Sequence, residues 1–352
     1  MVRLLRKPKI EVTVNDSGFD NPNSGTIKKQ REIWTASLVY PNPNGRLFEY
    51  FSSLDVIKIY LGLDELPDKP TFTGFVTSEL GERTKQLALH GRLYSANKDS
   101  VIIDEYSNLD GLEVSQAIYS LIDNLDISFT TRFNGTNPSV FVPDDFRYGR
   151  GIIVYSAIKQ LRDMAYDDSE FGKRPLYYFL YEEGDKLFFR KEPELVEANS
   201  WFTLTGGDNL IKGEPKAKTY GVINKQTVIG KDGVRATYTS AHRMAVDGTF
   251  AGNPIYDDSL LSAAECYEKA RVEVEENKFK TINTEITALE MIDAVPGLTI
   301  VEIQNSKNIV SGLHRAQDID IRFGKGFSIS TRIEKDIPVF GTEVALLLPS
   351  SS

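Results

Sequence analysis

The sequence predicts a mainly β protein with an α+β insert, in which two similar β-barrels flank a mixed α/β middle domain. Short segments in the outer thirds of the chain alternate apolar and polar residues with a period of two, whereas the middle shows helical periodicity. The 352 residues exceed the length that one hydrophobic core usually serves. We therefore expect several domains, with β structure dominating the first and the last.

Strands in the first third are predicted by β-branched and aromatic runs separated by turn signals. Ile10, Val12 and Val14 alternate with polar residues, which is typical of a strand with one solvated face. Residues 15–32 are polar and rich in glycine, asparagine and serine, so we expect a long hairpin loop there. Further strands are expected at residues 33–40, 46–51, 55–60, 71–77 and 85–94.

The middle of the chain combines helices with a hairpin. Apolar residues recur at helical spacing in residues 113–125 and 154–165, which predicts two amphipathic helices. Residues 176–190 read as a β-hairpin with a polar turn at its centre. Gly206-Gly207 and Gly213-Glu214-Pro215 mark the end of this region, because clusters of glycine and proline interrupt regular structure.

The last third returns to strands, interrupted by one long helix. Ser262 and Glu265 have the spacing of a capping box near the start of that helix. Strands are expected at residues 221–229, 234–240, 280–289, 298–303, 309–314 and 317–322, the last with a continuation at residues 327–333. The resulting domains are a first barrel at residues 1–110, the mixed domain at 111–215, a second barrel at 216–343 and a tail at 344–352.

The outer thirds share a pattern that suggests an internal repeat. A strand ending in Ile59 precedes Phe72-Thr73-Gly74-Phe75 and a strand ending in Gly91-Arg92. A strand ending in Ile303 likewise precedes Val310-Ser311-Gly312-Leu313 and a strand ending in Arg332. A glycine inside a strand often marks a bulge or a close backbone approach. The alternative is chance, since β meanders commonly share such short patterns.

The charge and the cysteine content exclude several classes of protein. The net charge is -9, which argues against a protein that binds nucleic acid by neutralising phosphates. The single cysteine, Cys266, excludes an internal disulfide and a cysteine-based zinc site. The longest apolar runs are too short to cross a bilayer, and the basic start of the chain is unlike a secretory signal. That basic start (Arg3, Arg6, Lys7 and Lys9) is more typical of a solvated leader than of a site for an acidic partner.

No catalytic, cofactor-binding or metal site is predicted, and we expect no cofactor and no enzymatic activity. The three histidines are His90, His242 and His314, which stand far apart and outside any metal-ligand spacing. Gly149-Arg150-Gly151 lacks the third glycine of a dinucleotide loop, and Gly324-Lys325-Gly326 is predicted to be a hairpin turn. The acid pairs are neighbours in sequence, which does not by itself place two carboxylates across a cleft as in a glycosidase. These pairs are Asp144-Asp145, Asp167-Asp168 and Asp257-Asp258.

The order of these features resembles the baseplate hub family of contractile phage tails, which includes the late-control D proteins and the hub portion of VgrG. The similarity covers roughly residues 50–335 and is strongest in the segment at residues 222–230, where Asn224-Lys225 leads into an alternating strand and a glycine. Other stretches that carry it are residues 55–62, 70–76, 115–124, 154–165, 177–190 and 209–213. We expect the chain to differ from VgrG in having no appended spike.

The resemblance implies a structural virion protein with two tube-type barrels per chain, assembled in the host cytoplasm into a homotrimeric ring in the tail baseplate. Three copies with two similar barrels each would adapt a six-fold tail tube to a three-fold spike. The implied partners are the tail tube protein, the spike protein and other baseplate or tape-measure proteins. DNA would pass the lumen without specific binding, and no membrane insertion is implied.

Two alternatives stay open. One is a related distal-tail or tube-initiator protein, and the other is a tail-associated peptidoglycan hydrolase with a carboxylate pair in the middle domain. The apolar run at residues 344–348 could fold back on its own core or dock on a neighbouring subunit or spike, and truncation after Thr342 would distinguish these.

Overall fold

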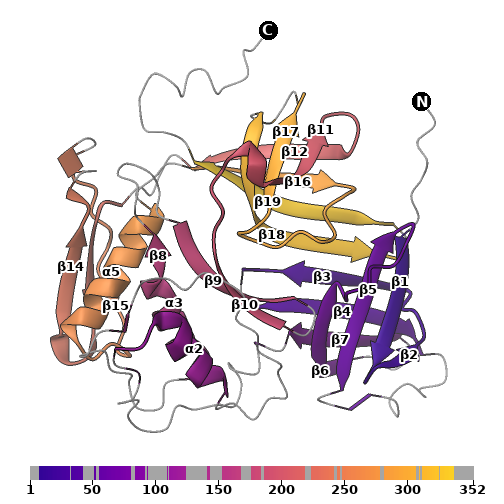
Figure 1. Ribbon diagram of the computed structural model, residues 1–352, viewed down its shortest axis with the longest axis horizontal. Coiled ribbons are helices and arrows are strands. Elements are labelled where there is room, and N and C mark those ends of the chain that lie inside the picture. Colours follow the sequence, from indigo (N-terminus) through magenta and orange to yellow (C-terminus); the bar gives the residue numbers. More distant parts are fainter. Residues whose placement is uncertain are drawn as a thin grey trace.

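The computed structural model shows a mainly β protein built on one large, almost entirely antiparallel sheet (Figure 1). The structure describes residues 8–31, 33–42, 51–52, 55–80, 84–91, 93, 109, 111–123, 141–142, 153–167, 176–183, 186–218, 223–241, 244–245, 248–277, 281–306, 309, 311–324 and 326–336. Among these residues, thirteen strands join in the large sheet and two three-stranded sheets lie apart from it.

The first third contributes seven strands to the large sheet, in the order β3-β4-β7-β6-β5-β1-β2. Burial alternates strictly along β4, whose residues Ala36, Leu38 and Tyr40 point into the core. This is the period-two pattern that the sequence predicts for a strand with one buried face. The strands are β1 (Pro8–Val14), β2 (Ser17–Phe19), β3 (Ser24–Lys29), β4 (Trp34–Pro41), β5 (Val56–Leu63), β6 (Phe72–Leu80) and β7 (Thr84–Gly91).

Residues 200–336, counted with the last third from here on, contribute the other six strands. β12, β16, β19 and β18 are consecutive neighbours, β17 pairs with β18, and β11 pairs with β17 in parallel. The strands are β11 (Ser200–Thr205), β12 (Leu210–Lys218), β16 (Thr281–Ala288), β17 (Ile300–Gln304), β18 (Gly312–Phe323) and β19 (Ser328–Asp336). A single buried apolar cluster runs through the strands of both outer thirds, so they share one core.

The two outer thirds repeat the same five-strand arrangement. The order β5-β6-β7-β4-β3 in the first third matches β17-β18-β19-β16-β12 in the last, with the strands in the same sequence order. Both long central strands carry a register shift at the same place, between Val76 and Ser78 in β6 and between Ala316 and Asp318 in β18. The two halves of the repeat therefore share the order of their strands and the position of the register shift.

The glycines and arginines that suggested the repeat are not its equivalent positions. Gly74 pairs with Ile57 of β5, and the matching pair in the last third joins His314 to Val301 of β17. Gly312 lies two residues earlier, at a positive φ of 111°. The sequence pattern therefore matched Gly74 to a residue two positions too early in the last third. Such a shift arises because short apolar runs fit each other in several registers.

The middle region forms a separate body beside the sheet (Figure 1). Helices α2 (Val114–Asp123) and α3 (Val154–Met164) pack together with Phe189 in their own apolar cluster. The hairpin of β9 (Leu176–Glu183) and β10 (Lys186–Lys191) connects this body to the sheet, because Tyr181 and Phe188 belong to the core of the sheet. A third strand, β8 (Tyr166–Asp167), pairs with β9.

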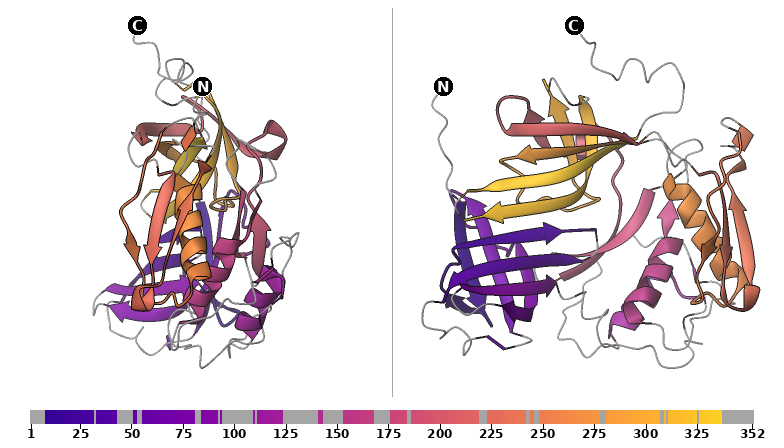
Figure 2. Two further views of the ribbon diagram at one scale, coloured as in Figure 1. Left: turned by 90° about the vertical axis from the view of Figure 1, so that its left-hand side faces the viewer. Right: turned by 180° about the vertical axis from the view of Figure 1, so that it is seen from behind.

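The long helix of the last third lies beside this body and not on the large sheet (Figures 1 and 2). It is α5 (Ala263–Asn277), and it packs on a small sheet of β13 (Lys225–Ile229), β14 (Arg235–Thr239) and β15 (Ile255–Tyr256). This unit is inserted between β12 and β16, the positions that β3 and β4 hold in the first third. Short 3₁₀ turns occur at Glu197–Asn199 and Lys231–Gly233.

Several strand predictions are wrong in an informative way. Residues 15–32, predicted as a loop, contain β2 and β3. Gly213-Glu214-Pro215, predicted to close the middle domain, lies inside β12. Residues 309–314 and 317–322 were predicted as two strands, but residues 312–314 and 317–322 belong to one bulged strand, β18, and β19 is a separate strand that returns along it. Most of the predicted strand at residues 46–51 and the apolar run at 344–348 lie outside the described residues.

Candidate assembly site

The outer thirds meet at a seam between β3 and β18. Five antiparallel residue pairs join these strands, from Ile319 opposite Lys29 to Phe323 opposite Gly25. The two strands lie side by side in both views of the molecule (Figures 1 and 2). The seam continues the sheet from one repeat into the other. The two repeats are therefore joined by antiparallel strand pairing.

Close packing at the seam requires a glycine. A Cβ atom on Gly25 would lie 2.5 Å from the ring of Phe323 and 2.7 Å from the backbone oxygen of Ser37. Phe323 is 3% exposed, so its ring has little room to move. The glycine in β3 therefore allows the backbone to approach an aromatic side chain of the other repeat.

A buried lysine at the seam donates hydrogen bonds to the loop after β16. Lys29 is 2% exposed, and its Nζ donates hydrogen bonds to the backbone oxygens of Ile292 at 2.8 Å and Ala294 at 3.3 Å. The same Nζ lies 4.8 Å from the centroid of the Trp34 ring. Carbonyl dipoles and an aromatic face compensate part of the cost of burying the charge.

A buried carboxylate from the middle of the chain completes the seam. Glu192 follows β10, and its side chain is fully buried. Its Oε1 accepts a hydrogen bond from Arg31 at 3.0 Å, and its Oε2 lies 3.9 Å from Nε of Arg315. Arg31 also donates to Oε1 of Gln317, at 2.9 and 3.2 Å. Three parts of the chain therefore meet in one ionic cluster, which we call the seam cluster.

Two strand edges in the sheet resemble the seam with one partner removed. β12 is the last strand of the path and pairs only with β16 within the described part of the chain. In β6, residues Phe72–Phe75 pair with β5, whereas residues 77–80 have a neighbour on the β7 side alone among the described residues. Unpaired strand edges are ready sites for adding another strand.

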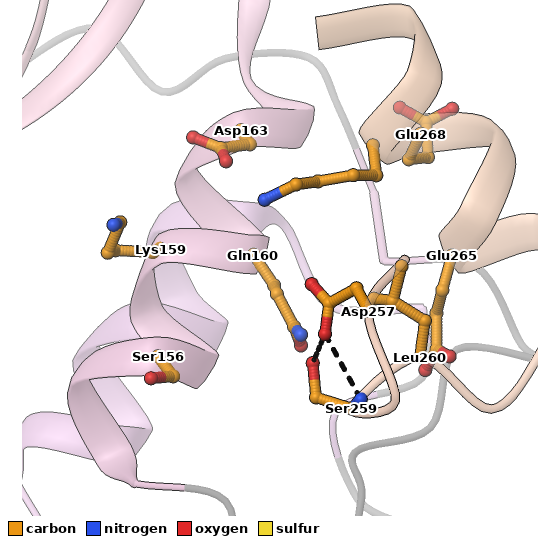
Figure 3. A pocket seen from close by; sticks show the side chains of 10 residues that line it. Ser156, Lys159, Gln160, Asp163, Asp257, Ser259, Leu260, Glu265 and Glu268 are labelled. Atoms are coloured by element: carbon orange, nitrogen blue, oxygen red, sulfur yellow. Dashed lines mark hydrogen bonds between the residues drawn. The ribbon is translucent and has the colours of Figure 1, made fainter. Parts of the chain in front are cut away.

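A cavity lies between α3 and α5, away from the sheet. Its volume is about 310 Å³, and Figure 3 shows Ser156, Gln160 and Asp163 of α3 facing Asp257 and Ser259. Asp257 accepts hydrogen bonds from the backbone and the hydroxyl of Ser259, at 3.1 and 2.5 Å.

The acidic side chains around this cavity have local structural partners. Glu265 accepts from the backbone nitrogens of Leu261 and Ser262, and Ser262 accepts from the backbone of Glu265 at 3.2 Å. This confirms the predicted capping box, at the start of α5. Asp163 pairs with Arg162, and Glu268 with Arg271.

The predicted histidines and acid pairs do not gather into one site within the described residues. His90 lies on β7, where its Nδ1 is 2.8 Å from the hydroxyl of Thr77. His314 is buried in β18. No group of three possible metal-ligating side chains occurs in the described part of the chain. Asp144-Asp145, Asp168 and His242 lie outside the described residues.

Reasoning from the sequence missed the seam. β3 was hidden by its polar composition, Ser24-Gly25-Thr26-Ile27-Lys28-Lys29, in which only Ile27 is apolar. The buried partners Lys29 and Glu192 belong to residue types that are almost always exposed. The available signal was the alternation of Thr26, Lys28 and their neighbours around Ile27, which is weak in a segment of six residues.

Comparison with solved structures identifies the fold. A tail protein from Neisseria meningitidis MC58 superposes with a TM-score of 0.61 at 14% identity, over 93% of this chain and 96% of that chain. The 43 kDa tail protein of prophage MuSo2 from Shewanella oneidensis gives 0.59 at 12% identity, over 93% and 98%. The chain has a phage tail protein fold.

The same fold occurs in a chain of a PdpA–VgrG complex. A chain of the PdpA–VgrG complex from Francisella superposes with a TM-score of 0.51 at 11% identity, and the match covers 94% of this chain but 58% of that one. This confirms the resemblance to the baseplate hub and VgrG fold. No protein-family model matches the sequence, and no curated protein is significantly similar to it. None of the described helices has the length and apolar character needed to span a membrane.

Proposed function

We propose that this protein is a structural component of a phage tail baseplate, a hub that forms a homotrimeric ring around the DNA channel. The observation that carries the proposal is the repeated five-strand arrangement, joined through the β3–β18 seam. A chain with two similar modules can form a ring of three subunits that presents six similar surfaces. Such a ring adapts a six-fold tail tube on one side to a three-fold spike on the other.

The proposed domain layout follows from this role. The two modules, β3–β7 and β12 with β16–β19, form the two tube-type barrels, so the second barrel begins before residue 216, and α2, α3 and the β9–β10 hairpin form the body outside the ring. The unit that contains α5 lies with that outer body, as its packing beside α3 supports. Closing each barrel and joining barrels edge to edge would satisfy strand edges that are otherwise open.

The charge of the chain agrees with a channel that DNA crosses without binding. The net charge is -9, and a lumen lined by neutral or acidic groups would not trap a polyanion. The proposed partners are the tail tube, the spike and other baseplate or tape-measure proteins, in a virion assembled in the host cytoplasm. A lumen lined with lysine and arginine would contradict this part of the proposal.

The role we propose is non-enzymatic. Acidic residues line the cavity between α3 and α5, and each of Asp163, Asp257, Glu265 and Glu268 has a local structural partner. Hydrolysis of purified peptidoglycan that is lost in Asp163→Asn or Asp257→Asn would instead favour a tail-associated hydrolase.

Solution mass combined with negative-stain imaging tests the proposal. We expect three-fold rings with a mass three times the 39.5 kDa of the chain. Six-fold rings would favour a distal-tail or tube-initiator protein. A chain that stays monomeric at all concentrations, alone and with tube and spike proteins, would contradict the hub.

A further inference from the structure

The internal seam predicts which strands join one subunit to the next. In the repeat, β12 holds the position of β3. Ile27 of β3 pairs with Ala36 of β4, and Pro215 of β12 pairs with Thr284 of β16. Ala36 and Thr284 then pair with Leu89 of β7 and Ile333 of β19, which are equivalent strands. Counting along the strands places Ala217 at the position of Lys29.

The other half of the seam also has a counterpart, because β6 holds the position of β18. Just before the bulge, the backbone nitrogen of Ala316 donates to the oxygen of Thr299 at 2.9 Å. The backbone nitrogen of Val76 likewise donates to the oxygen of Asp55, at 3.4 Å. The two strands are therefore equivalent up to the bulge, and Glu79 lies at the position of Ile319.

The difference between the repeats lies beyond the bulge. In β18, the first residues pair with β17 and the last residues pair with β3, both on the side away from β19. In β6, the first residues pair with β5, and the last residues have no strand on that side within the described part of the chain. One chain thus contains one complete seam and the two separate halves of a second.

We propose that β12 of one chain pairs antiparallel with the end of β6 in a second copy of the chain. The register repeats the internal seam, with Ala217 opposite Glu79 and Lys216 opposite Leu80, as Lys29 lies opposite Ile319 and Lys28 opposite Asp320. This inference rests on the proposed ring and adds its strands and register. The contact is heterologous, so three copies can close a ring.

Two features of β12 are typical of a strand at an open edge. Ile211, a large apolar side chain, is 53% exposed. Pro215 has no backbone donor and is tolerated in a strand only at an edge. The missing donor at Pro215 disfavours pairing with unrelated strands at this position. The proposed pair of Ala217 with Glu79 does not involve Pro215.

Disulfide trapping tests this register. In a Cys266→Ser background, the double variant Lys216→Cys with Leu80→Cys places the two thiols directly opposite each other. Six strands separate β12 from β6 within one chain, and the two lie at the top and the bottom of the large sheet in Figure 1, so the bond can form only between copies. We expect a covalent trimer on a non-reducing gel after mild oxidation.

The matched control is Lys216→Cys with Glu79→Cys. A shift of one residue puts the two side chains on opposite faces of the sheet, so cross-linking should fall at least tenfold. Equal cross-linking of the two pairs would overturn the register. Rings without any cross-link in the Leu80 pair would overturn the strand assignment and leave the proposed hub intact, whereas a wild-type chain that forms no ring overturns both.

Discussion

Glu192 is the residue through which the middle of the chain reaches the contact between the outer thirds. Its carboxylate is fully buried, and Arg315 beside it is 3% exposed. A buried ion pair is weak evidence for net stability, because desolvation offsets much of the attraction between the charges. Removing one partner is nevertheless costly, since the other charge stays buried without compensation. The seam cluster therefore makes the geometry of the seam depend on the middle body.

The variant Glu192→Ala should lower the free energy of unfolding by about 3–5 kcal/mol, because it leaves Arg315 buried without its carboxylate. Urea denaturation followed by circular dichroism measures the change. The control is Glu194→Ala, two residues away and exposed, which should change stability by less than about 0.5 kcal/mol. Equal effects of the two variants would show that the seam cluster contributes little.

Cys266 should be unreactive in the folded protein. The residue is buried between α5 and the β13–β14 sheet, and burial raises the pKa of its thiol. The thiol therefore stays protonated at mildly alkaline pH, and its contribution to stability is lost as the pH rises through the raised pKa. We expect a thiol reagent to modify Cys266 only after unfolding. Tyr256→Cys, at a position 74% exposed, should react at once in the Cys266→Ser background.

At the scale of the elements, the sequence predicted the strands and helices in which buried residues recur with a regular spacing. Leu38, Leu87 and Leu89 are buried positions that alternate with more exposed ones, and β4 and β7 were predicted. The helical spacing of Val154, Ile158 and Leu161 predicted α3. β3 and the middle of β12 were missed, because strands at a seam or an edge bury backbone and charged groups as well as apolar side chains. The seam itself could not be predicted, since the residues that pair across it are nearly 300 positions apart.

The glycine of β6 gives a prediction at this scale. A Cβ atom on Gly74 would clash with the backbone oxygen of His90 in β7 and lie 2.7 Å from the Phe72 ring. We expect Gly74→Val to lower the free energy of unfolding by roughly 1–3 kcal/mol or more, and Gly312→Val to act similarly because of its positive φ. Thermal denaturation measures both. Gly18→Val, at a position in β2 with open space around it, is the control.

At the scale of the whole molecule, the internal seam and the proposed contact between subunits share a backbone arrangement but differ in side chains. Gln317 at the bulge of β18 accepts hydrogen bonds from Arg31, whereas Thr77 at the equivalent position of β6 contacts His90 and the backbone oxygen of Ala88 of its own repeat. Arg315, which contacts Glu192, is replaced by Phe75. The seam cluster therefore has no counterpart in the equivalent positions of β6, and the proposed ring would be three-fold and not six-fold.

This asymmetry predicts two separable transitions. Because the internal seam has the ionic cluster and is covalently continuous, we expect the ring to dissociate into folded monomers before the chains unfold. Dilution or moderate urea should reduce the mass in sedimentation from three chains to one while the circular dichroism of the sheet is unchanged. The dissociation midpoint should shift with protein concentration, and the unfolding midpoint should not. A single concerted transition at every concentration would show instead that the two seams have similar strength.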